Sequence, residues 1–131
     1  MERYDPSTNE WEEEAVAPMP STRRYVGTAV LDGKLYAVGG VNHNDDDVLS
    51  SVERYDPATN AWEAVAPMAE ARCDHAVAVL DGKLYAVGGY GVWLYLSSVE
   101  RYDPATNAWE AVASLATARN ELAVAVLDGK L

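Results

Sequence analysis

A repeated segment of about 47 residues constrains the fold of this chain more than any other feature of its sequence. The string Glu-Arg-Tyr-Asp-Pro occurs three times, and a tryptophan follows its tyrosine by seven residues in every copy. The string Leu-Asp-Gly-Lys-Leu also occurs three times, and successive copies of either string lie 47 to 51 residues apart. A fixed period of this size is typical of solenoids and propellers, in which each unit packs on its neighbours. We therefore expect a repeat architecture.

Within each repeat the hydrophobic pattern is that of short antiparallel strands. Asp81-Gly82 is a strong hairpin signal between two apolar runs, and Gly88-Gly89 ends the second run. The first two strands are apolar on both faces, which suits sheets sandwiched between neighbouring sheets. Four antiparallel strands are predicted in each unit. In the second unit they cover residues 75–80, 83–87, 97–102 and 109–113.

The repeat resembles the Kelch motif. Leu-Tyr-Ala-Val-Gly-Gly occurs at residues 35–40 and 84–89, and the recurring aromatic residues are Tyr4, Tyr55, Tyr102, Trp11, Trp62 and Trp109. The resemblance implies an all-β fold of Kelch-type β-propeller blades, each with four antiparallel strands and its first strand lining a central channel. It also implies protein recognition, because the family mostly binds proteins, often as the substrate-binding part of ubiquitin-ligase adaptors. A minority are copper enzymes, but no Tyr, Cys or His position here matches their metal site.

The repeats divide the chain into about three blades. We expect one domain over residues 1–131, made of a partial blade (1–18), a blade (19–67), a second blade (68–114) and the first strand of a next blade (115–131). Propellers usually close with about four to eight blades. One copy therefore cannot form a ring, and we expect a homodimer or an excerpt of a longer sequence. Two copies still leave each joint blade without its second strand.

Composition narrows the classes of partner. A net charge of −11 repels phosphate backbones and anionic membranes, so we expect neither nucleic acid nor membrane as a partner. No apolar run approaches the length of a membrane helix, and the N-terminus carries no secretory pattern. Cys73 is the only cysteine, so no disulfide can form within the chain. These features predict a cytoplasmic or recombinant protein without a cofactor, and solubility is the simplest reason for its acidity.

Differences among the repeats fall at one end of the blades. The turns after the first and third strands are constant, and antiparallel pairing places both at the same end. The connections at the opposite end vary, which is where a binding surface on a fixed scaffold is expected. We predict that these connections bind a protein or peptide. The candidate residues are Arg24, Tyr25, His43, Asp45, Asp46, Asp47, Asp74, His75, Tyr90, Trp93, Tyr95, Asn120 and Glu121.

Several of these residues have a structural alternative. The aromatic residues of segment 90–95 could anchor a partner or pack on an adjacent blade. The run 45–47 beside His43 could hold a cation, but it lacks the pattern of an EF-hand and suits a solvated loop. Cys73 and His75 would lie on one side of a regular strand, yet no third ligand is evident, so no metal site is predicted.

Arginines precede the first strand of every unit. Arg23, Arg72 and Arg119 are constant, which favours a structural role, whereas Arg24 occurs once and is the better contact for a ligand. The near-identity of the units indicates a consensus or designed sequence. The sequence thus predicts a non-enzymatic, engineered Kelch scaffold that binds a protein through one variable set of loops. The alternatives are a purely structural self-assembling propeller and, third, a metal-binding or enzymatic Kelch protein.

Overall fold

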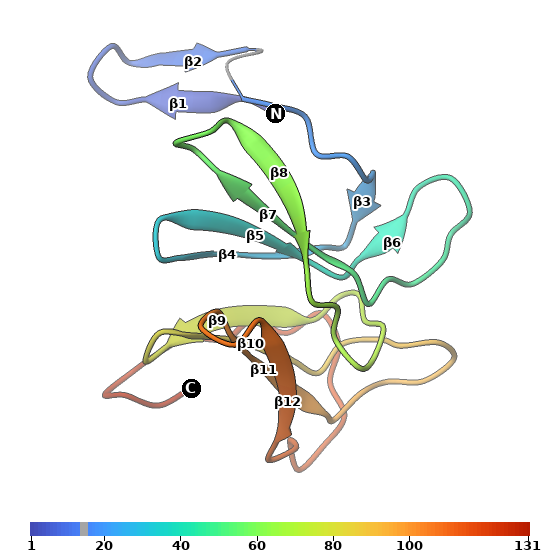
Figure 1. Ribbon diagram of the computed structural model, residues 1–131. Helices are drawn as coiled ribbons and strands as arrows, with labels where there is room; N and C mark the ends of the chain where they lie inside the picture. Colours follow the sequence, from blue (N-terminus) through green and yellow to red (C-terminus); the bar gives the residue numbers. More distant parts are fainter. Residues whose placement is uncertain (14–15) are drawn as a thin grey trace.

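The computed structural model describes residues 1–13 and 16–131 (Figure 1). Its described part is all β, and it contains no helix that is long and apolar enough to cross a membrane. The strands are β1 (Arg3–Asp5), β2 (Glu10–Glu12), β3 (Arg23–Arg24), β4 (Gly27–Leu31), β5 (Lys34–Val38), β6 (Val41–Asn42), β7 (Val52–Asp56), β8 (Ala61–Val65), β9 (Ala76–Leu80), β10 (Lys83–Val87), β11 (Val99–Asp103) and β12 (Ala108–Val112).

Two sheets of four antiparallel strands form the body of the molecule. The first has the order β4-β5-β7-β8, and the second has the order β9-β10-β11-β12. Within each sheet a strand pairs with the next strand of that sheet along the chain, and β6 is passed over between β5 and β7. Equivalent residues pair in both sheets, such as Tyr55 with Trp62 and Tyr102 with Trp109. This is the blade predicted from the repeat. Figure 1 shows the two sheets stacked face to face, with the β1–β2 hairpin beside the first.

The constant turns have the backbone geometry that their residues favour. Asp32 and Gly33 both have positive φ, of 50° and 72°, as a two-residue hairpin turn of type I′ requires. In the turn between the third and fourth strands, the Asp56 carboxylate accepts a hydrogen bond from the backbone N–H of Ala58. Asn60 then takes a positive φ of 50°, which asparagine tolerates. The hairpins are therefore specified by local residues.

The hydrophobic core lies between the two sheets. Tyr36, Val38 and Val52 of the first sheet are almost fully buried, and Leu84 and Tyr102 of the second sheet pack against them. The Tyr36 and Tyr102 rings meet with their centroids 5.7 Å apart. The inner faces of the two sheets are therefore apolar because they pack against each other.

A buried arginine organises each blade. The Arg72 side chain has no exposed surface, and its guanidinium donates to the carbonyl oxygens of Gly88 (2.7 Å) and Ser98 (3.1 Å) and to the Glu100 carboxylate (2.8 Å). Arg23 donates to the equivalent groups in the first blade, including Glu53 at 3.0 Å. The predicted structural role of the constant arginines is confirmed for these two.

Two features differ from a simple four-strand repeat. The short pair β3–β6 joins Arg23–Arg24 to Val41–Asn42 outside the main sheets, and the sequence did not predict it. Residues 115–131 contain one isolated bridge, between Leu127 and Lys130, and no other strand pairing. Strand formation there requires a partner strand that this segment does not have, so the first strand of a further blade stays a prediction.

Candidate functional site

The variable connections gather at one end of the blades. In Figure 1 the loops that follow β6 and β10 project to the right, whereas the β4–β5 and β7–β8 turns lie at the left. We call the right-hand end the variable rim. It consists of residues 24–25 and 43–47 of the first blade, 73–75 and 90–95 of the second, and 120–122. The predicted separation of constant turns and variable loops is present in the fold.

The loop 43–47 is tied to the start of its own blade. The Arg24 guanidinium forms an ion pair with the Asp46 carboxylate, and the Arg24 Cζ atom lies 5.6 Å from the Tyr25 ring centroid. Asp45 accepts hydrogen bonds from the side chain of Asn42 and the backbone N–H of Asp47. Arg24 and the acidic run therefore form one cluster, whose Asp46 side chain remains 73% exposed.

The loop 90–95 presents apolar side chains to solvent. Trp93 is 88% exposed with a positive φ of 80°, and Tyr95 is 59% exposed. Tyr90 packs edge-on against Tyr95, with ring centroids 5.4 Å apart. Val92 and Leu94, which sequence reasoning did not select, are each 55% exposed. The sequence could have indicated Val92 and Leu94, because apolar residues in a loop without a strand pattern have no core in which to be buried.

A shallow groove lies between these two loops. Asp46, Asp47 and Val48 line one side, and Tyr90, Val92 and Trp93 line the other. Its volume is about 290 Å³. The groove joins predicted residues from two blades and combines carboxylates with exposed aromatic surface, a combination that suits the side chains of a partner protein.

Tyr25, Asp74 and Glu121 occupy the same position in three successive units. Each has a positive φ near 50°, and the Asp74 N–H donates to the Tyr25 carbonyl (3.2 Å), while the Glu121 N–H donates to the Asp74 carbonyl (2.8 Å). This backbone chain fixes the three side chains along the rim. Burial raises the pKa of the Asp74 carboxyl, and the neighbouring Glu121 carboxylate raises it further. Asn120, beside Glu121, is partly exposed.

His75 and Cys73 differ from the other candidates because both are buried. The His75 side chain is 7% exposed, and neither ring nitrogen has a hydrogen-bond partner within the described structure. Burial, followed by the nearby Arg72 charge, lowers the pKa of His75 to about 3. Burial likewise raises the pKa of the Cys73 thiol. Because Asp74 between them has positive φ, the strand alternation expected for residues 73 and 75 was wrong.

Residues 43–47 and 73–75 contain the side chains that could in principle bind a cation. Among the residues that the structure describes, no group of three or more His, Cys, Asp or Glu side chains is arranged to hold a metal ion. His43 and Asp47 are exposed in the loop. The arrangement there is that of a solvated loop held by its own hydrogen bonds.

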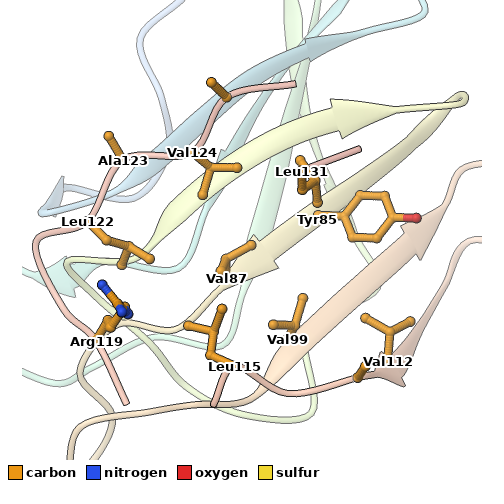
Figure 2. Close-up of a pocket in the computed structure, with 12 residues that line it drawn as sticks. Tyr85, Val87, Val99, Val112, Leu115, Arg119, Leu122, Ala123, Val124 and Leu131 are labelled. Carbon is orange, nitrogen blue, oxygen red and sulfur yellow. The ribbon is translucent and has the colours of Figure 1, made fainter. Parts of the chain in front are cut away.

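A second concave feature lies on the face of the second sheet that points away from the first, and Leu122 of the variable rim is among its lining residues. A cavity of about 480 Å³ separates this face from residues 115–131 (Figure 2). Tyr85, Val87, Val99 and Val112 of the sheet face Leu122, Val124 and Leu131 across it, and Arg119 lies at one end. Sequence reasoning predicted strands that are apolar on both faces but did not locate this cavity.

Stacked four-stranded antiparallel sheets, one constant end and one variable end define a segment of a β-propeller. The family model described as the Kelch motif matches residues 22–69 and 71–116. The chain therefore belongs to the Kelch-repeat family, and the resemblance predicted from the repeat is confirmed.

Individual proteins match parts of the chain. It is 42% identical over 62 residues to human Kelch-like protein 23, an alignment that covers 47% of this chain and 11% of that protein. It is 48% identical over 60 residues to human Kelch-like protein 33, covering 46% of this chain and 10% of that protein. The matches thus span about a tenth of the length of these relatives.

The solved structures give the same fold. The structure of YjhT superposes with a TM-score of 0.74 at 20% sequence identity, and the match covers 82% of this chain and 41% of YjhT. At this level of identity the similarity establishes the propeller fold alone.

Proposed function

We propose that this chain is a non-enzymatic Kelch scaffold that binds a protein or peptide partner through the variable rim. The observation that carries the proposal is the groove between loops 43–47 and 90–95, in which Asp46 and Asp47 face Tyr90 and Trp93. Exposed Trp and Tyr are the side chains that most often dominate the binding energy of protein interfaces. The chain belongs to the Kelch-repeat family, and the protein recognition that is common in this family supports the same class of function. A cytoplasmic location is part of this proposal.

The rim proposal is tested by replacing loops while the blades are kept. Gly-Ser sequence over residues 43–47 and 92–95 should abolish binding to a partner that has been recovered, identified and purified, because it removes the aromatic and acidic contacts. The matched control carries Gly-Ser at Pro104-Ala105, in the turn at the constant end. Binding is measured by calorimetry and folding by thermal melting. Unchanged binding by the rim variant, or equal loss in the control, would contradict the proposal.

The near-identity of the units supports an engineered, consensus-like origin as a further part of the proposal. Residues 31–40 and 80–89 both read Leu-Asp-Gly-Lys-Leu-Tyr-Ala-Val-Gly-Gly. Consensus substitutions commonly raise stability, so the same melt should give a midpoint above the range of about 45–65 °C that is usual for mesophilic domains. A midpoint inside that range would speak against a consensus origin.

Self-association is a second candidate function. It is favoured by the apolar face of the second sheet, where Tyr85, Val87 and Val99 border a cavity instead of a packed sheet. Apolar surface of this kind is characteristic of interaction sites, and unpaired strand edges invite pairing with another chain. We propose that copies of the chain associate through this face.

A further inference from the structure

Adjacent blades are joined by the same pair of reciprocal hydrogen bonds. The Trp109 indole Nε1–H donates to the Ala66 carbonyl oxygen at 2.8 Å, and the Ala66 N–H donates to the Asn107 side-chain oxygen at 3.0 Å. The tryptophan and asparagine belong to one blade, and the alanine follows the fourth strand of the blade before it. We call this arrangement the Trp-Asn latch.

The latch recurs one repeat earlier with equivalent residues. The Trp62 Nε1–H donates to the Ala17 carbonyl at 2.9 Å, and the Ala17 N–H donates to Asn60 Oδ1 at 2.8 Å. Two independent occurrences with the same atoms show that the latch is a property of the repeat and fixes how one blade sits on the next. The tyrosine hydroxyl that orients the asparagine also recurs, from Tyr55 and from Tyr102.

The chain also contains both sets of residues needed for a third latch, but they do not form it with each other. Trp11 and Asn9 correspond to Trp109 and Asn107, and Tyr4 already donates to Asn9 Oδ1 at 2.7 Å. Trp11 is nevertheless 66% exposed. Ala113 corresponds to Ala66, and within the described residues neither its backbone nor the Trp11 indole makes a hydrogen bond. The Trp11 indole N–H therefore matches the Ala113 carbonyl oxygen as a donor and acceptor pair.

The charged residues around these two sets of residues are complementary as well. Within each complete blade the arginine before the first strand pairs with the glutamate of the third, as Arg72 does with Glu100 at 2.8 Å. The lysine after the hairpin turn pairs with the aspartate that ends the third strand, as Lys83 does with Asp103 at 2.7 Å. The residues left at the same positions are Arg119 and Lys130, which follow Ala113 in the chain, and Glu2 and Asp5, which precede Trp11.

From these matches we propose that the β1–β2 hairpin of one copy docks on the second sheet of another copy through a Trp-Asn latch. Trp11 and Asn9 of the first copy bind Ala113 of the second, while Glu2 and Asp5 meet Arg119 and Lys130. A closed dimer uses the same contact twice. The proposal rests on the self-association proposed above and names the residues that determine it.

Docking would also fill the cavity of Figure 2. Between the two observed blades, the Tyr102 ring packs against the Tyr36 ring. Tyr36 occupies the same position in the first sheet as Tyr85 does in the second. Tyr4 is the residue of the hairpin that corresponds to Tyr102, and it is 43% exposed. The latch brings Tyr4 over Tyr85 and Val99, and both apolar surfaces leave water together.

The expected contact is reversible. The latch, the charged pairs and the apolar surface are the contacts that this proposal places between the copies. Association should therefore weaken on dilution into the low micromolar range, and it should respond to salt through the charged pairs.

Light scattering and sedimentation of the full chain between about 1 and 100 µM test the proposal. We expect the wild-type mass to rise from 14.2 kDa towards twice that value with concentration. Trp11→Ala should weaken association at least about tenfold, as loss of a buried tryptophan contact does at interfaces. Trp93→Ala is the matched control, because it also removes an exposed tryptophan but lies on the rim, and it should associate like wild type.

A charge exchange separates the latch from other modes of association. Glu2→Lys alone and Arg119→Glu alone should each weaken association at least about tenfold, because the docked pair corresponds to the buried Arg72–Glu100 pair. The double variant should recover part of this loss, since its two charges are again opposite. A wild-type chain that stays at 14.2 kDa overturns both the latch and self-association. A dimer unaffected by Trp11→Ala, or not recovered by the double exchange, overturns the latch and leaves self-association through another surface.

Discussion

His75 stands at a position that is apolar in the other two repeats, where Val26 and Leu122 occur. Its imidazole fits between the blades because Gly27 faces it, at the position that is Ala76 in the second blade. A Cβ atom on Gly27 would lie 2.6 Å from His75 Nε2. Both ring nitrogens are buried without a partner in the described structure, so the folded protein holds this histidine neutral.

The titration of His75 predicts a loss of stability in mild acid. Its pKa falls from an ordinary 6.5 to about 3 on folding, because burial and then the Arg72 charge oppose protonation. Between these values the unfolded chain binds a proton that the folded chain does not, so the stabilisation is complete above pH 6.5 and declines as the pH falls towards 3. Chemical denaturation at a series of pH values should show the wild type losing about 1.4 kcal/mol per pH unit more than His75→Leu over this window.

The leucine variant is the natural control, because Leu122 already occupies the equivalent site. It retains the carboxylates whose pKa values folding lowers, including Asp56 and Asp103, so their contribution cancels in the comparison. Parallel pH profiles for the two proteins would show that folding does not lower the pKa of His75.

At the scale of the strand, two ion pairs of the second blade are expected to contribute very differently to the free energy of unfolding. Glu100 is buried and accepts hydrogen bonds from Arg72 (2.8 Å) and from the backbone N–H of Ala69 (2.7 Å). Glu100→Gln leaves the Arg72 charge buried without a counter-charge and should cost about 3–5 kcal/mol of unfolding free energy. Glu110→Gln removes a carboxylate that pairs with Arg101 on the exposed side of the same blade and should cost less than about 1 kcal/mol. Equal losses in urea denaturation would contradict this assignment.

The elements that the sequence predicted are those specified by local chemistry. Asp-Gly turns, the Asp-Pro turn and apolar strands depend on a few neighbouring residues, and in the two complete blades all of them form as expected. The β3–β6 pair and the burial of His75 depend on contacts between segments far apart in the chain. No local pattern distinguishes a histidine packed against Gly27 from one on the rim surface, so sequence reasoning grouped His75 with the exposed candidates.

The candidate site was likewise predictable in its local features but not in its contacts between distant segments. Comparison of the repeats found the loops, and therefore Asp46, Tyr90 and Trp93, because the scaffold is constant everywhere else. It could not show that the two loops face each other across a groove, or that Arg24 is engaged by Asp46. Those facts depend on how one blade is rotated on the next, which the interblade contacts determine.

On the scale of the whole molecule, stability should depend on which sheet faces are covered. In repeat proteins the free energy of folding is approximately a sum over units and over the interfaces between neighbours. Tyr36 and Tyr85 occupy the same position in the two blades, but Tyr36 is 1% exposed between the sheets, whereas Tyr85 borders the cavity of about 480 Å³. Substituting Tyr36 therefore tests a covered sheet face, whereas substituting Tyr85 tests a face that only a second copy would cover.

Substituting each tyrosine by alanine separates the two situations. Tyr36→Ala should cost about 3–5 kcal/mol at every protein concentration, because it opens a cavity within one copy. Tyr85→Ala should cost little at about 1 µM and progressively more towards about 100 µM, since a partner that binds only the folded state stabilises it by mass action. Thermal melts over this range provide the measurement, with the wild-type midpoint rising with concentration and the Tyr85→Ala midpoint staying constant. A wild-type midpoint independent of concentration would mean that no second copy covers this face, and the stability of the chain would then come from a single interface between its two sheets.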